Sequence, residues 1–153
     1  MGRRVYVHKK HIVEYGAAAF NYQSEEFKDA LNTLGLSVCG DEYGDEFEVD
    51  KEYYKLALDT IKKHKNHILN WEKGDYNSIH AEKKIKTNTV TIDDDGEKVS
   101  EDSSYEIELE VYPHDFLDVL KELNMTIDEF IEDMENFYKS ADKHCEYLHF
   151  SVW

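Results

Sequence analysis

A chain of 153 residues has the length of one ordinary domain, and a single proline with seven glycines excludes collagen-like and linker-type sequences. Aromatic residues make up 13% of the chain, which argues against disorder although 34% of the residues are charged. The formal net charge of −16 disfavours binding to duplex DNA and to anionic membranes, because both of these ligands are themselves negative.

The first elements expected along the chain are a strand and a helix. Valine and tyrosine at residues 5–7 favour a strand, which can resume at residues 12–13. Ser24 is a natural N-cap residue, and the apolar residues after it recur at helical spacing. We therefore expect a helix over 24–34, with Gly35 at the position where glycine commonly ends a helix.

A second strand and a long helix follow. Residues 46–49 alternate acidic and apolar side chains, as a strand with one buried face does. Asp50 is a good N-cap, and apolar residues keep a helical spacing from Tyr53 to Trp71. These patterns predict a strand at 46–49 and a helix over 51–71.

A change to a period of two indicates a β-hairpin in the second half of the chain. Val90 and Ile92 lead into a turn that contains Asp95-Gly96, and apolar residues alternate again over 105–111. Residues 97–104 show no such alternation, so we expect them to form a frayed or long connection.

The last expected elements are two helices and a strand. Apolar spacing predicts a helix over 115–123. Thr126 and Glu129 form a capping box at the start of a further helix over 127–141. The apolar, alternating segment 147–152 is expected to pair within the sheet.

These elements predict a single α+β domain over residues 1–153, with a mixed or antiparallel sheet and about four helices packed against it.

No apolar run typical of a signal peptide follows the basic residues near the start, and no stretch is apolar enough to cross a membrane. Cys39 and Cys145 are far apart in the sequence and form no Cys-x-x-Cys motif. Because no export signal is recognised, we expect both to be reduced thiols. We expect a cytoplasmic protein with no membrane association.

The charge is distributed unevenly along the chain. Residues 91–153 carry nineteen acidic and four basic side chains, whereas residues 61–90 carry three acidic and seven basic ones. On a strand over 105–111, three glutamates lie on the face opposite Ile107 and Leu109, about 6.7 Å apart. The strand over 46–49 also carries glutamates on one face, and the helix over 127–141 carries acidic side chains on its outer face. The candidate partner-binding residues are Glu46, Glu48, Glu106, Glu108, Glu110, Asp128, Glu132 and Asp133.

The favoured function is that of a non-enzymatic acidic binding protein, an inhibitor or interaction module that docks a basic protein partner. Nucleic-acid mimicry and neutralisation of a toxin or nuclease are examples of this class. Three alternatives stay open: an acidic surface that only confers solubility, a small enzyme with an unrecognised active site, and a nucleic-acid binder that uses the basic segment 62–86. A homo-oligomer is compatible with the sequence, and direct nucleic-acid binding is disfavoured.

Patterns for metal binding and catalysis are weak. His64 and His67 share a helix face, but the sequence does not locate a third ligand for them. The segment 91–102 matches a calcium loop poorly, and a charged hairpin turn explains it better. Cys145 follows His144, but adjacent residues on a strand point to opposite faces. We expect no cofactor, no metal needed for folding and no recognisable catalytic residue.

Overall fold

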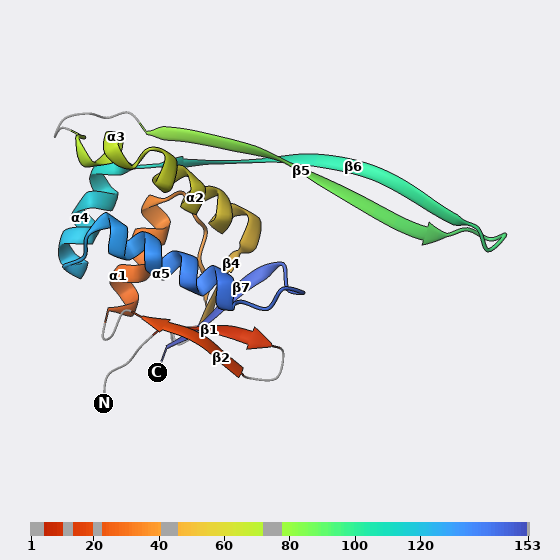
Figure 1. The fold of residues 1–153 in the computed structure, drawn as a ribbon, viewed down its shortest axis with the longest axis horizontal. Coiled ribbons are helices and arrows are strands. Elements are labelled where there is room, and N and C mark those ends of the chain that lie inside the picture. Colours follow the sequence, from red (N-terminus) through yellow and green to blue (C-terminus); the bar gives the residue numbers. More distant parts are fainter. Residues whose placement is uncertain (1–4, 11–13, 20–22, 41–45, 72–77, 153) are drawn as a thin grey trace.

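The protein has an α+β fold in the computed structural model, which describes residues 5–10, 14–19, 23–40, 46–71 and 78–152. These residues form five helices and two antiparallel sheets (Figure 1). The elements are β1 (Val5–Lys10), β2 (Glu14–Ala19), α1 (Ser24–Thr33), β3 (Cys39–Gly40), β4 (Glu46–Asp50), α2 (Lys51–Lys63), α3 (Lys65–Leu69), β5 (Ile79–Ile92), β6 (Lys98–Val111), α4 (Pro113–Leu123), α5 (Ile127–Ser140) and β7 (Tyr147–Val152).

The larger sheet has five strands in the order β2-β1-β7-β4-β3. The predicted strand 147–152 is confirmed as β7, and it occupies the centre, paired antiparallel to β1 on one side and to β4 on the other. The predicted strand 5–7 is the start of β1, and 46–49 lies within β4. The sequence did not predict β2, and residues 12–13 lie outside the described ranges.

Most helix boundaries agree with the sequence to within two residues. The Asp50 carboxylate accepts the backbone N–H groups of Glu52 and Tyr53 and so caps α2. Thr126 and Glu129 form the predicted capping box of α5.

Two details of the helix predictions are wrong. Gln23, and not Ser24, is the N-cap of α1, because Ser24 already lies within the helix. The helix predicted over 51–71 is two helices, α2 and α3, because the backbone of His64 between them (φ −103°, ψ 16°) leaves the α region.

Phenylalanine rings from distant segments form the centre of the core. Phe150 on β7 is fully buried, and its ring stacks on Phe47 of β4 at a centroid distance of 4.9 Å. The rings of Phe27 from α1 and Phe137 from α5 meet Phe150 edge-on, at 5.6 and 5.3 Å. The central strand, the neighbouring strand and two helices are thus joined through one side chain.

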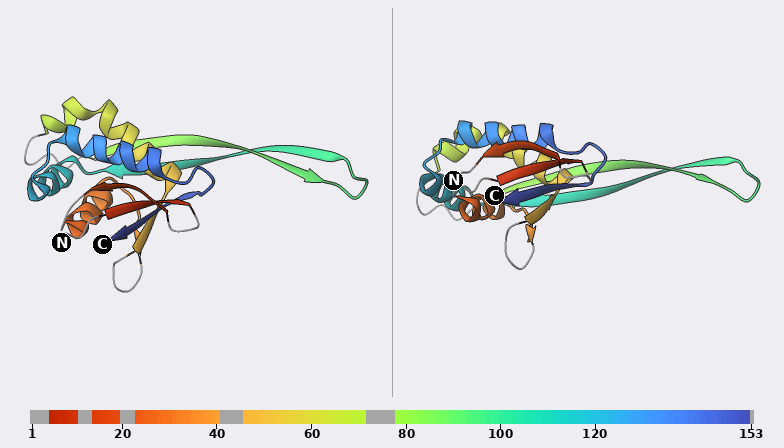
Figure 2. Two further views of the ribbon diagram at one scale, coloured as in Figure 1. Left: turned by 60° about the horizontal axis from the view of Figure 1, so that its bottom comes forward. Right: turned by 90° about the horizontal axis from the view of Figure 1, so that it is seen from below.

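Strands β5 and β6 form a long two-stranded hairpin that extends away from the rest of the fold (Figures 1 and 2). Pairing is unbroken from Ile79 opposite Val111 to Ile92 opposite Lys98. The prediction that residues 97–104 form a frayed connection is therefore wrong, because backbone pairing continues where the side chains show no buried face.

The hairpin has two parts that differ in burial. In the hairpin base, residues 79–85 and 105–111, the side chains of Ile107, Leu109 and Val111 are buried. In the outer hairpin, residues 86–104, every side chain is exposed. Only the base is therefore fixed by packing against the rest of the protein.

The turn after α1 packs directly against the hairpin base. Gly35 has φ +80°, and a Cβ atom there would lie 2.6 Å from the backbone oxygen of Glu110. The backbone N–H of Tyr112 donates to the carbonyl of Thr33 at 2.8 Å. Glycine at 35 serves both the predicted helix end and this close approach.

Candidate functional site: an acidic groove at the hairpin base

The predicted column of carboxylates on β6 is present. Glu106, Glu108 and Glu110 are exposed, while Ile107 and Leu109 between them are 2% and 5% exposed. A strand with one face on the core separates alternate residues in this way. The column runs along the outward face of the hairpin base.

The partner strand adds a histidine and a further glutamate to this face. His80 of β5 lies directly opposite Glu110, and Glu82 lies opposite Glu108. His80 Nε2 is 3.8 Å from Glu82 Oε2 and 3.7 Å from Glu108 Oε2, while His80 Nδ1 is 3.8 Å from Glu110 Oε1. We call these four residues the hairpin-base cluster.

Glu108 also borders a groove between the hairpin and the larger sheet. The groove has a volume of about 460 Å³ and is lined by Glu48 and Asp50 from β4, by Glu108 from β6, and by Tyr53 and Tyr147. The segment after α1 closes one side of it with Gly35, Ser37 and Cys39. Two strands predicted separately to carry carboxylates thus meet at one hollow, which we call the acidic groove.

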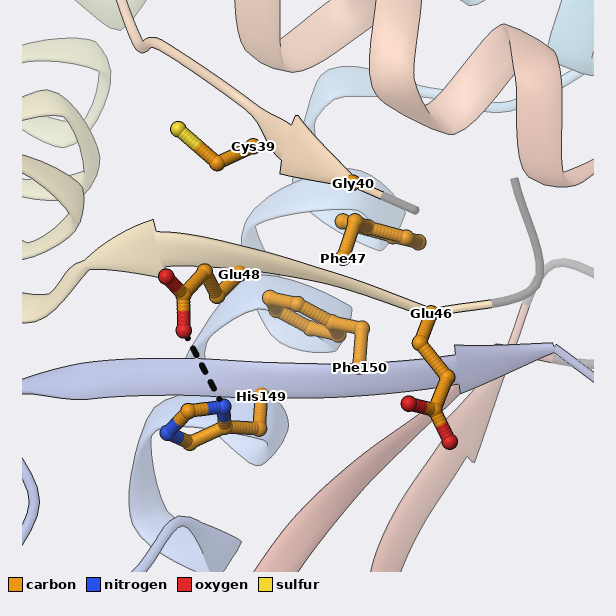
Figure 3. Close-up of a pocket in the computed structure, with 7 residues that line it drawn as sticks. All are labelled: Cys39, Gly40, Glu46, Phe47, Glu48, His149 and Phe150. Atoms are coloured by element: carbon orange, nitrogen blue, oxygen red, sulfur yellow. Dashed lines mark ion pairs between the residues drawn. The ribbon is translucent and has the colours of Figure 1, made fainter. Parts of the chain in front are cut away.

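A shallower hollow of about 290 Å³ adjoins the acidic groove on the outer face of the larger sheet (Figure 3). Glu46 lines it, and Cys39, Glu48 and His149 form a cross-strand row beside it. Glu48 Oε2 lies 3.3 Å from His149 Nδ1. The carboxylate is between the thiol and the imidazole in this row, so the row does not provide the adjacent thiol and base of a cysteine nucleophile.

The acidic residues of α5 belong to a different surface. Helix α5 packs on α2, β1 and β2, and its carboxylates meet lysines of the basic segment. Lys65 forms an ion pair with Asp128, and Lys62 Nζ lies 2.7 Å from Glu135 Oε1. The structure therefore brings Glu48 and Glu108 together at the acidic groove and places Glu46 at the adjoining hollow. Asp128, Glu132 and Asp133 line neither hollow.

Asp133 is half-buried, as Glu48 on β4 is. Burial raises the pKa of its carboxyl, and the nearby Glu132 and Glu129 raise it further. Glu132 itself is exposed.

The weaker sequence patterns do not converge on a site in the described residues. His67 packs edge-on against Trp71 at 4.9 Å, and His64 is a helix cap. Burial raises the pKa of the Cys145 thiol, and Asp142 raises it further, which opposes formation of a nucleophilic thiolate. The segment that resembled a calcium loop is the hairpin turn, where Asp93 accepts the backbone N–H groups of Asp95 and Glu97.

His80 and Glu82 are the site residues that sequence reasoning missed. Their spacing at i, i+2 would place both on one face of a strand, but the alternation of apolar residues starts only later in the chain. Recognising them requires the hairpin register, which sets each opposite a glutamate of β6.

Comparisons of the chain with protein families, with curated proteins and with solved structures found no match. None of the helices in the described ranges has the length and apolar character needed to span a bilayer.

Proposed function

We propose that this protein is a non-enzymatic acidic binding protein, an inhibitor or interaction module that docks a basic protein partner at the acidic groove. The observation that supports this proposal is the meeting of Glu48 and Glu108, which come from different sheets, in one hollow. Carboxylates converge there across elements, whereas a surface that only confers solubility requires no such convergence.

The groove suits an arginine or lysine side chain of the partner. Its carboxylates can accept charge-assisted hydrogen bonds from a guanidinium or ammonium group. Tyr53 and Tyr147 add aromatic rings that can contact the same cation. Glu106 and Glu110, on either side of Glu108, extend the negative field along β6 and favour approach of a basic surface.

Helix α5 is the weaker candidate for the docking surface. Lys65 and Lys62 already pair with Asp128 and Glu135, so two of its carboxylates are neutralised from within the chain. These pairs also weaken the alternative that the basic segment 62–86 binds nucleic acid, because two of its lysines are engaged by glutamate and aspartate.

Two variants with the same change in net charge test the proposal. One replaces Glu106, Glu108 and Glu110 by Gln, and the control carries Asp128→Asn, Glu132→Gln and Asp133→Asn on α5. We measure binding of each to an arginine-rich peptide by fluorescence anisotropy at low and high salt. The same pair of variants is then tested against a basic protein captured from the native host by the unmodified chain.

The β6 variant should bind about tenfold more weakly at low salt, because exposed charge pairs contribute about 0.2–1 kcal/mol each. Most of the loss should come from slower association, and the α5 control should bind nearly as well as the parent. Equal losses in the two variants would show that only net charge matters and would overturn the proposal.

A further inference from the structure

In the hairpin-base cluster an imidazole lies among three carboxylates. One ligand atom from each of His80, Glu82 and Glu108 lies within 4.8 Å of the other two. Among the described residues, this is the group of three or more metal-ligating side chains that comes this close. We propose that His80, Glu82 and Glu108 bind a divalent zinc ion.

The distances are close to those that a zinc ion requires. Zinc binds imidazole nitrogen and carboxylate oxygen at about 2.0–2.2 Å, so ligand atoms of a tetrahedral site lie about 3.3 Å apart. His80 Nε2 is now 3.8 and 3.7 Å from the two carboxylate oxygens. Small rotations of the exposed glutamate side chains bring all three atoms to zinc distance, and solvent supplies the remaining ligand.

The strand register places the side chains of His80, Glu82 and Glu108 on one face of the hairpin. Glu82 and Glu108 are directly opposite each other on paired strands, and His80 is two residues before Glu82 on the same face. Two like charges in directly opposite positions destabilise a sheet. The next pair outward on this face, Lys84 opposite Glu106, has opposite charges. Glu82 and Glu108 are therefore the pair on this face with like charges, and a dication bound between them removes their repulsion.

A third carboxylate lies beside the other ring nitrogen of His80. Glu110 Oε1 faces His80 Nδ1 at 3.8 Å, and the Ser78 hydroxyl donates to Glu110 Oε2 at 2.9 Å. A carboxylate at Nδ1 favours the tautomer whose Nε2 lone pair faces Glu82 and Glu108, an arrangement common around zinc-bound histidines. Glu110 is thus a positioning residue and not a ligand.

The ligand set favours zinc over calcium or magnesium. Both of these hard cations prefer oxygen ligands and gain little from imidazole, whereas zinc accepts nitrogen and oxygen together. The site is exposed and lies outside the core, so we expect folding to be independent of the ion.

The test is calorimetric titration of the full chain, without a polyhistidine tag, with zinc chloride alone. We expect one equivalent to bind, with at least tenfold weaker affinity in His80→Ala and in the double variant Glu82→Gln, Glu108→Gln. Glu110→Gln should weaken binding by about 10–100-fold, the usual cost of losing a residue that orients a metal ligand. The matched control, His64→Ala with His67→Ala, should bind zinc as the parent does.

A second measurement identifies the ligand atom. The ring-nitrogen NMR signals of His80 should show that Nε2, and not Nδ1, shifts when zinc is added. Unchanged affinity in His80→Ala, loss of binding in the helix control, or equal competition by calcium would each overturn the proposal. The titration contains no protein partner, so its failure is distinct from a failure of the docking function, although Glu108 belongs to both sites.

Discussion

The hairpin base and the outer hairpin share one continuous ladder of backbone pairing, yet they are stabilised in different ways. In the base, Ile107 and Leu109 are buried, and Gly35 packs against the backbone of β6. In the outer hairpin both faces are exposed, including Ile92 at 71%. Local groups alone stabilise it, such as the hydrogen bonds of Asn88 to Ser100 and Asp102 across the strands.

This difference shows that regular secondary structure need not imply equal stability along its length. A two-stranded ribbon without a packed face is only marginally stable in water. The outer hairpin should therefore open at a much lower free energy than the base, without unfolding the rest of the protein. Three substitutions, each with a matched control, test this difference in stability.

The largest effect is expected at the centre of the core. Phe150→Ala removes a fully buried ring that contacts Phe47, Phe27 and Phe137, and should lower the free energy of unfolding by about 3–5 kcal/mol. Its control, Ile92→Thr in the outer hairpin, should change that free energy by less than about 0.5 kcal/mol. Urea denaturation measures both. Similar losses would mean that the outer hairpin unfolds together with the body.

An intermediate effect is expected at two glycines with nearly the same backbone. Gly35 and Gly96 have φ +80° and +82°, but a Cβ atom at 35 meets the Glu110 carbonyl whereas one at 96 has open space around it. Gly96→Ala should cost about 1–2 kcal/mol locally, from the backbone alone. Gly35→Ala should cost more than that in global stability, because the turn must move away from β6. Thermal unfolding compares them, and equal shifts would contradict the close packing described here.

The smallest effect concerns charge in the body and in the hairpin. The raised pKa of Asp133 means that the folded state binds its proton more tightly than the unfolded chain does. The ionised carboxyl therefore destabilises the fold at neutral pH, and this penalty is lost as the pH falls through the raised pKa.

Asp133→Asn should accordingly raise stability at pH 7 by about 0.2–0.5 kcal/mol, the size of an i, i+4 like-charge repulsion such as that with Glu129. At a pH below the ordinary range of aspartate the gain should disappear. Glu101→Gln on the outer hairpin is the control and should change stability at neither pH, because Glu101 is exposed. A gain that persists in acid would show that charge is not its cause.

The parts of the fold that the sequence predicted are those where burial imposes a pattern. Apolar spacing located α1, α4 and α5, and alternation located β4, β7 and the end of β6. Strand β2 was missed because the sequence EYGAAA contains glycine and alanine, which rarely favour strands. Residues 97–104 were wrongly predicted to be a frayed connection. Both faces of this part of the hairpin are exposed to solvent, so its sequence shows no alternation of apolar and polar residues.

The candidate site was predictable to the same extent. The carboxylate column on β6 followed from alternation with Ile107 and Leu109, since the core dictates which face each residue takes. Its meeting with Glu48 depends on how the hairpin packs against the larger sheet, and the opposition of Glu82 to Glu108 depends on strand register. Neither the packing of the hairpin on the larger sheet nor the strand register produces a pattern in the local sequence.

The central position of β7 has a consequence for the order in which the fold can assemble. Strands β1–β2 and β3–β4 are local antiparallel pairs. The two pairs are joined into one sheet only when β7 pairs with β1 on one side and with β4 on the other. A ribosome that synthesises the chain from its N-terminus releases both pairs long before residues 147–152 emerge. During that interval two unpaired strand edges and the Phe47 and Phe27 rings are uncovered, which is the state most exposed to aggregation and to capture by chaperones.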